Sequence, residues 1–133
     1  MLNMLVSFVA IIVVMLVLDG VWLGWIAKDF YQRGLRRAIV FEVRWWAAVL
    51  FYLLHAAGTL YFVVAGDVAL WQVLLRGAFF GLATYGTYNL TNLATVRNWP
   101  VGVAFLDMAW GSLITMLAAL AAFGVASGFS LLP

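Results

Sequence analysis

Two aspartates stand in apolar surroundings, and each is followed three residues later by a tryptophan. Asp19 precedes Trp22, and Asp107 precedes Trp110, so on a helix each carboxyl shares a face with an indole N–H. Because an ionised acid is costly in hydrocarbon, it must be protonated, paired or turned to the protein interior. Intramembrane acids are typical of ligand or proton sites, which is the function predicted here. The structural alternative is hydrogen bonding between helices.

Further polar groups inside the apolar segments could complete a site with these acids. The single histidine, His55, could relay protons or orient a ligand, although we favour a histidine bonded to one core partner. Deeply placed tyrosines need hydrogen-bond partners and could line an aromatic pocket. No metal-ligand spacing occurs, so we predict no metal and no cofactor, and no catalytic residue is assigned. The predicted ligand-binding residues are Asp19, Trp22, Tyr52, His55, Tyr85, Tyr88, Asn89, Asn92, Asp107 and Trp110.

Residues 85–100 form the densest polar run of the chain. The run carries two tyrosines, three threonines, three asparagines and one arginine, and it ends on a proline. Its polar side chains continue a stripe of small residues at three- and four-residue spacing, so small and polar groups share one face of a helix. Small residues let a neighbouring helix approach, and polar residues bond across the interface. The stripe consists of Gly77, Gly81, Thr84, Tyr85, Tyr88, Asn92 and Thr95.

Composition excludes several classes of protein. Of 133 residues, 68% are hydrophobic and 9% are charged, whereas soluble domains carry about 25% charged residues. The absence of cysteine excludes disulfides, thiol chemistry and thiolate metal sites. A net charge of +2 gives nucleic-acid binding no support. An integral membrane protein remains.

Apolar runs of membrane-spanning length predict four helices in one transmembrane domain, residues 1–133. The spans are expected at about 4–27, 45–65, 71–95 and 101–127. The first lacks a basic leader and is too long for a signal segment, so we expect a retained helix. Because helices satisfy their own backbone in lipid, the predicted fold is all-α, an integral membrane four-helix bundle with short links.

Basic residues predict the orientation of these helices. The first link is rich in them, the third contains Arg97, and the second has none, which places the first and third links in the cytoplasm and both termini on the non-cytoplasmic side. Arg76 departs from this pattern and could snorkel outward along its stem. The first link is either a solvated loop or a short interfacial helix. Its basic residues are Lys28, Arg33, Arg36, Arg37 and Arg44.

The polar residues of all four spans lie at similar predicted depths. With a helical rise of about 1.5 Å per residue, Asp19, Tyr52 and Tyr88 lie about 12 Å from the cytoplasmic ends of their spans, and Asp107 lies about 10 Å from its own. The spans therefore deliver acids, phenols and amides to one slab in the cytoplasmic half. One turn deeper or shallower lie His55, Tyr85 and Asn92.

Four motifs carry a resemblance to a known family. They are Asp-x-x-Trp-Leu at 19–23, Phe-Tyr-Leu-Leu at 51–54, Tyr-Gly-Thr-Tyr-Asn-Leu-Thr-Asn-Leu-Ala-Thr at 85–95 and Asp-x-Ala-Trp-Gly at 107–111. In these motifs the chain resembles a family of small bacterial inner-membrane proteins of unknown function. The resemblance covers nearly the whole chain and implies a multi-pass protein of the bacterial inner membrane. It implies no activity.

Two residues depart from the family pattern. The pattern has an acid where this chain has Asn89, and an aromatic hydroxyl where it has His55. A mechanism that needs an ionisable group at position 89 is therefore not expected here.

Four functions fit these observations. The leading hypothesis is a polar, aromatic-lined site in the cytoplasmic half that binds a small amphipathic or lipid-like molecule. The second is proton-coupled transport of a small molecule by a dimer, with Asp19 as the membrane acid. The third is a membrane-lipid-modifying enzyme in which Asp19 or Asp107 is the base and His55 or a tyrosine the acid. The fourth is a structural or accessory subunit. Expected partners are membrane lipids and the amphipathic ligand, and a homodimer remains open.

Overall fold

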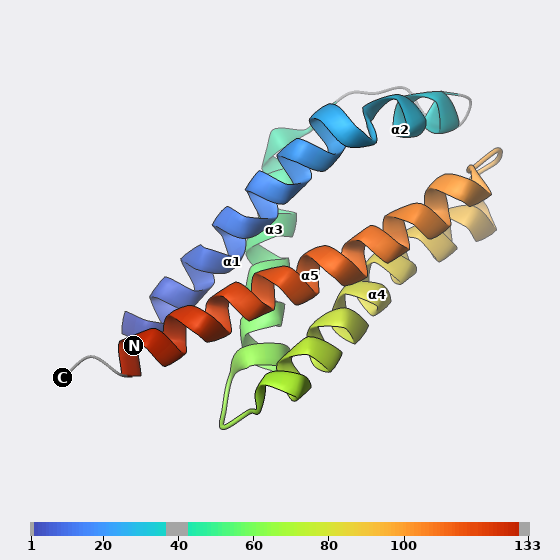
Figure 1. The fold of residues 1–133 in the computed structure, drawn as a ribbon. Coiled ribbons are helices and arrows are strands. Elements are labelled where there is room, and N and C mark those ends of the chain that lie inside the picture. Colours follow the sequence, from blue (N-terminus) through green and yellow to red (C-terminus); the bar gives the residue numbers. More distant parts are fainter. Residues whose placement is uncertain (1, 37–42, 131–133) are drawn as a thin grey trace.

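The computed structural model describes residues 2–36 and 43–130, and these residues form an all-helical structure, as predicted (Figure 1). All the basic residues named above lie within the described residues except Arg37. Two π-helical turns, η1 and η2, extend helices α1 and α3. The elements are α1 (Leu2–Val21), η1 (Trp22–Ile26), α2 (Lys28–Leu35), α3 (Trp45–Thr59), η2 (Leu60–Val64), α4 (Leu70–Thr95) and α5 (Val101–Ser130).

Three segments are long and apolar enough to cross a membrane: Asn3–Ile26, Trp45–Val64 and Val101–Gly128. They coincide with the first, second and fourth predicted spans. Helix α4 matches the bounds of the third predicted span, and it has 26 residues, but it does not reach the same apolarity. The difference arises because its second half carries the polar run.

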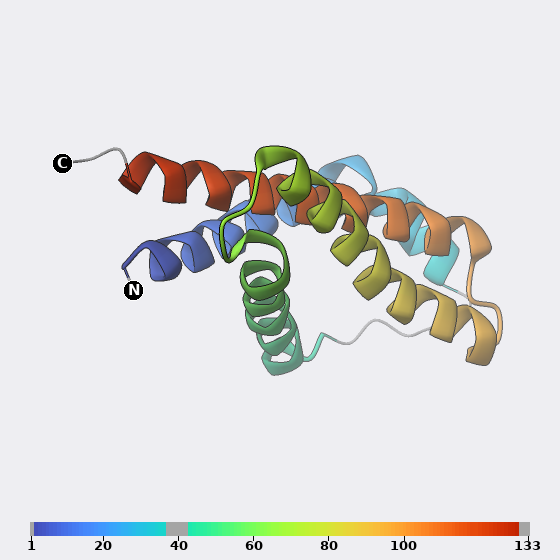
Figure 2. The same ribbon diagram turned by 90° about the horizontal axis from the view of Figure 1, so that it is seen from below.

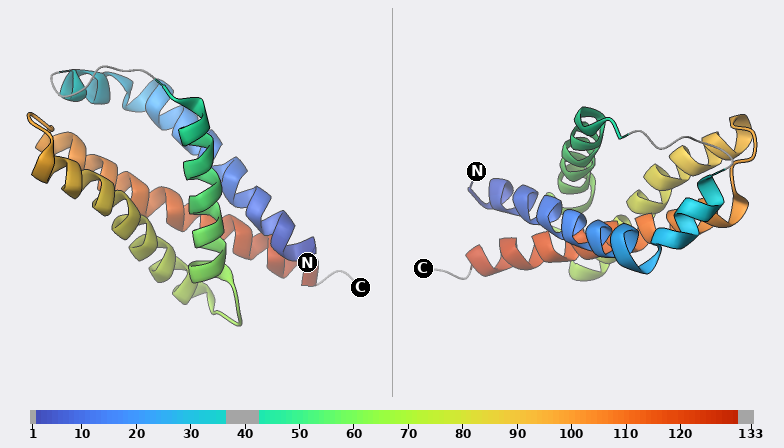
Figure 3. Two further views of the ribbon diagram at one scale, coloured as in Figure 1. Left: turned by 180° about the vertical axis from the view of Figure 1, so that it is seen from behind. Right: turned by 90° about the horizontal axis from the view of Figure 1, so that it is seen from above.

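The helices meet in an open arrangement that leaves α3 apart from α4 over most of their lengths. Helices α1 and α5 run antiparallel and side by side, and the N-terminus lies near the end of α5 (Figure 1). Helix α4 packs along α5, and α3 crosses α1 and α5 on the side that faces the viewer in the left panel of Figure 3. Helices α3 and α4 approach each other through η2 and the link at Gly66, whose φ is +93°, and then diverge (Figure 2).

Glycines bring α4 and α5 into close contact, as the predicted stripe requires. A methyl group at Gly81 would overlap the carbonyl oxygen of Gly111, and one at Gly111 would overlap the ring of Tyr85. A methyl at Gly77 would lie 3.0 Å from the Met116 backbone. The two backbones therefore touch at positions where no larger residue fits.

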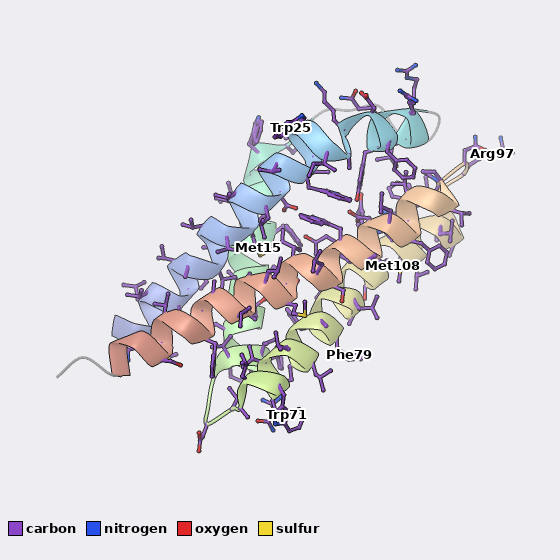
Figure 4. The ribbon with its side chains drawn as sticks, in the orientation of Figure 1. Met15, Trp25, Trp71, Phe79, Arg97 and Met108 are labelled. Atoms are coloured by element: carbon purple, nitrogen blue, oxygen red, sulfur yellow. The ribbon has the colours of Figure 1, made fainter. Side chains whose placement is uncertain are left out.

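The core lies mainly between α1 and α5. Its fully buried side chains include Ile11, Met15 and Ile114, and Figure 4 shows Met15 between these two helices. Large apolar side chains also cover the outside, where Phe79 is 71% exposed on α4. Such a surface would be costly in water and suits a lipid environment.

Part of the first link forms a helix, α2. Helix α2 turns away from α1 after η1 and packs on the start of α5. Leu35 is buried there against Trp99, Val103 and Ala104. The apolar face of α2 therefore contacts protein, while Gln32 and Arg33 are exposed.

Candidate functional site

The two Asp-x-x-Trp motifs are joined crosswise. Asp19 accepts a hydrogen bond from the indole N–H of Trp110, on the opposite helix, at 2.8 Å. The indole N–H of Trp22 donates to the Tyr31 hydroxyl at 3.2 Å, and that hydroxyl donates to Asp107 at 2.9 Å. The two indoles stack with centroids 4.4 Å apart and planes 4° from parallel. Each indole thus leads to the aspartate of the other motif, and not to the one on its own face.

Two further residues complete the hydrogen bonding of the carboxylates. The Tyr52 hydroxyl donates to Asp19 Oδ2 at 2.5 Å. The Asn89 amide nitrogen donates to Asp107 Oδ2 at 2.6 Å and to the Tyr85 backbone carbonyl at 3.0 Å. Each carboxylate therefore accepts a hydrogen bond on both oxygens. We call this set the polar cluster; its members are Asp19, Trp22, Tyr31, Tyr52, Asn89, Asp107 and Trp110.

Tyr31 belongs to the cluster although it lies beyond the end of the first apolar span. The π-helical turn η1 ends with a hydrogen bond from the Ala27 N–H to the Trp22 carbonyl at 2.7 Å. The chain changes direction after this turn, so that Tyr31 on α2 lies against Trp22. Burial raises the pKa of the Tyr31 hydroxyl above its ordinary value, and the Asp107 charge raises it further. The hydroxyl therefore stays protonated and donates. The four-residue spacing of Tyr31 and Leu35 was the signal that α2 has a protein-facing side.

Other predicted site residues lie outside the polar cluster. His55 is buried and bonds Thr115 Oγ1 through Nε2 at 2.9 Å, so it has the one core partner that we favoured. The structure does not join it to either aspartate. Tyr88 is 55% exposed and contacts the ring of Trp99, and half-buried Asn92 has no side-chain link to the cluster in the described residues.

A cavity of about 510 Å³ lies where α3 and α4 diverge, and the polar cluster forms one wall of it. Tyr52, Tyr85 and Tyr88 line this cavity together with Trp110, whereas Trp22 stacks against Trp110 and does not line it. Both carboxyl groups reach this cavity. Its lining residues are Asp19, Leu23, Ala47, Ala48, Phe51, Tyr52, Thr84, Tyr85, Tyr88, Asp107 and Trp110.

A second cavity, of about 320 Å³, adjoins the first. The two share Leu23, Tyr88 and Asp107, so Asp107 stands at their junction. Asn89 and Trp99 line the second cavity, and each has a buried polar atom without a hydrogen-bond partner, Oδ1 and Nε1 respectively. Trp99 is thus a buried residue in the wall of the second cavity. Lys28, Tyr31, Gln32, Leu35 and Val103 complete the lining.

The cluster offers chemistry suited to holding a ligand. Its carboxylates are acceptors at a cavity wall, and its phenol and indole rings give that wall apolar surfaces with polar tips. In the described residues, no group of three histidine or acidic side chains is placed to hold a metal ion.

Comparison with known proteins connects this arrangement to one family. Residues 4–124 match the family described as a predicted membrane protein, DUF2177. No curated protein and no solved structure shows a significant similarity to the chain. The match includes every member of the polar cluster and covers nearly all of the sequence, so the chain belongs to the predicted membrane protein family DUF2177.

Proposed function

We propose that four helices cross the membrane, α4 included, in the bacterial inner membrane and with both termini on the non-cytoplasmic side. A helix of 26 residues is about 39 Å long, enough to span a hydrocarbon core of about 30 Å. The buried side of α4 faces α5, which shields part of its polar run from lipid. Arg76, exposed near the other end, reaches the outer surface along its own stem.

The cysteine-free chain makes this topology directly testable. Cysteines introduced singly for Asp67 and Gln32, in intact cells, should react oppositely with a membrane-impermeant maleimide: Asp67→Cys is labelled at once, and Gln32→Cys is labelled after permeabilisation. Neither change removes a basic residue, so the orientation signal is kept. Equal labelling of both before permeabilisation would contradict the proposal.

We propose that the protein binds a small amphipathic, lipid-like molecule at the polar cluster. The observation that carries this proposal is the cavity of about 510 Å³ between the diverging α3 and α4, with both aspartates in its wall. Its size is within the range of about 300–1,000 Å³ typical of small-molecule sites. The bound polar end lies against the cluster, while the apolar part runs between the helices.

The walls of the cavity suit such a molecule. Leu23, Ala47 and Phe51 supply apolar surface, and the phenol of Tyr52 and the carboxyl of Asp19 supply polar contacts. Ala47 and Ala48 on α3 are small, so they take up little of the cavity. The polar group then lies in the cytoplasmic half of the membrane, at the depth that the sequence predicts for the acids.

Filling the cavity should remove the ligand without changing the helices. Ala48 lines the cavity, whereas the neighbouring Val49 is exposed and does not line it. Ala48→Trp should lower the amount of small molecule retained on extraction with native lipids at least about tenfold, because an indole occupies much of the space. Val49→Trp is the matched control and should retain it. Native mass spectrometry of both proteins measures the bound mass, and equal retention would refute the site.

A further inference from the structure

We infer that the polar group bound at this site is a primary ammonium, carried by an amine-bearing lipid headgroup. The inference rests on the proposed binding function and specifies the ligand. The polar cluster contains two acids and no basic side chain. Both aspartates accept hydrogen bonds from phenol, indole and amide groups, and within the described residues neither has an ion pair with a basic side chain. An ionised carboxylate at this depth is stabilised by a positive charge beside it, and we assign that charge to a ligand.

The walls around Asp107 suit a cation. The rings of Tyr85, Tyr88 and Trp110 line the same cavity as the two carboxyl groups. Aromatic faces attract ammonium groups, and most strongly where water is excluded. An anionic group placed here would instead meet like charge in a region of low dielectric.

Asn89 decides which kind of cation fits. Its amide nitrogen already donates to Asp107 and to the Tyr85 carbonyl, which fixes the orientation of the amide. Its Oδ1 is therefore an acceptor, it has no partner, and the residue is 1% exposed. Because Oδ1 and the nitrogen belong to one amide, this free acceptor lies within a few ångströms of the Asp107 carboxylate. A primary ammonium has N–H groups for both, whereas a quaternary ammonium has none.

The second cavity indicates what the ammonium is attached to. Beyond Asp107 it is lined by Lys28, a cation, and by Trp99, whose indole N–H lacks a partner. These are groups that bind an anionic oxygen such as that of a phosphate. An amine and a phosphate held side by side are the parts of an aminoethyl phosphate headgroup.

The test compares three lipids with identical dioleoyl chains: phosphatidylethanolamine, phosphatidylcholine and phosphatidylglycerol. Added to the delipidated full chain and measured by native mass spectrometry, the first should be retained about tenfold better than the other two, the difference expected from one charge-assisted hydrogen bond. Free O-phosphoethanolamine carries the same amine and phosphate without acyl chains, so it distinguishes the free headgroup compound from the lipid as the ligand. Displacement of the lipid by this compound assigns the recognition to the headgroup alone; failure to displace it assigns the site to the lipid form.

Variants at position 89 keep the inference open to refutation. Asn89→Leu should abolish the preference for phosphatidylethanolamine over phosphatidylcholine, and Asn89→Asp, which adds acceptors, should retain or increase it. Asn92→Leu on the same helix, outside the cluster, is the control and should leave the preference unchanged. Equal retention of the three lipids, or a preference for phosphatidylglycerol, overturns the ammonium inference while leaving lipid binding intact. No retention of any lipid overturns the proposed function itself.

Discussion

Replacing Gly81 with alanine should separate α4 from α5 and lower the free energy of unfolding by about 3 kcal/mol, the upper part of the usual range for overpacking. The added methyl would overlap the Gly111 carbonyl oxygen and lie 2.7 Å from the Thr115 hydroxyl. Because one obstacle is backbone, a rotamer change cannot relieve the contact. The Thr115 hydroxyl also bonds His55, so the change disturbs the attachment of α3 as well. Thermal unfolding in detergent measures the loss.

Gly124 on α5 provides the matched control. A methyl group there meets nothing within 4 Å, so Gly124→Ala should be neutral or stabilise the helix by about 0.5–1 kcal/mol, the amount by which alanine exceeds glycine in helix interiors. If Gly81→Ala unfolds at the same temperature as Gly124→Ala, the two helices do not approach as closely as the structure shows.

The sequence predicted the helices well because the apolar runs are long and their punctuation is clear. The predicted starts and ends of the four spans agree with the structure within a few residues. A close helix contact on this face of α4 was also predictable, since glycines at four-residue spacing let a neighbouring helix approach, but the sequence did not identify α5 as that neighbour. Helix length and apolarity disagree for one helix. Helix α4 has 26 residues, which is long enough for a membrane span, but its composition is too polar for it to count as one.

The pairing within the site was not predictable. Because each tryptophan shares a helical face with the aspartate of its own motif, the sequence suggested a hydrogen bond within each motif. These side chains instead point toward a neighbouring helix and bond there, so that Trp110 donates to Asp19. The π-helical turn η1 has no clear sequence signal, and without it Tyr31 could not be placed against Asp107. The sequence also could not tell that Asn89 would be the most buried polar residue of the cluster while Tyr88 is largely exposed.

The crosswise pairing has a consequence for how the helices hold together. Each aspartate joins three helices: Asp19 on α1 binds side chains from α3 and α5, and Asp107 on α5 binds side chains from α2 and α4. The stacked indoles connect the two halves. A ligand that binds one carboxylate therefore acts on contacts among all five helices.

Replacing Asp107 with leucine should lower the free energy of unfolding more than replacing it with asparagine, and it should weaken the attachment of α2 to α5. It removes the acceptor of both the Tyr31 hydroxyl and the Asn89 amide, and each donor left unpaired in a buried site costs about 1–3 kcal/mol, for a total of about 3 kcal/mol. Asp107→Asn keeps one acceptor and should lose about half as much. Hydrogen exchange in residues 28–35 should accelerate in the leucine variant, because Tyr31 no longer holds α2 to α5.

A double-mutant cycle decides whether the loss comes from the polar cluster or from a local change in packing. Tyr31→Phe removes the hydroxyl that donates to Asp107. The substitution should therefore cost about 1 kcal/mol or more in the native background, and much less when Asp107 is already leucine and the hydroxyl has no acceptor. Asp29→Asn, an exposed acid on α2, is the control and should change neither stability nor exchange. Additive effects of the two substitutions would mean that Tyr31 and Asp107 are neighbours without energetic coupling. Coupling of about 1 kcal/mol would identify the hydrogen bond between them as part of what fixes α2 against the site.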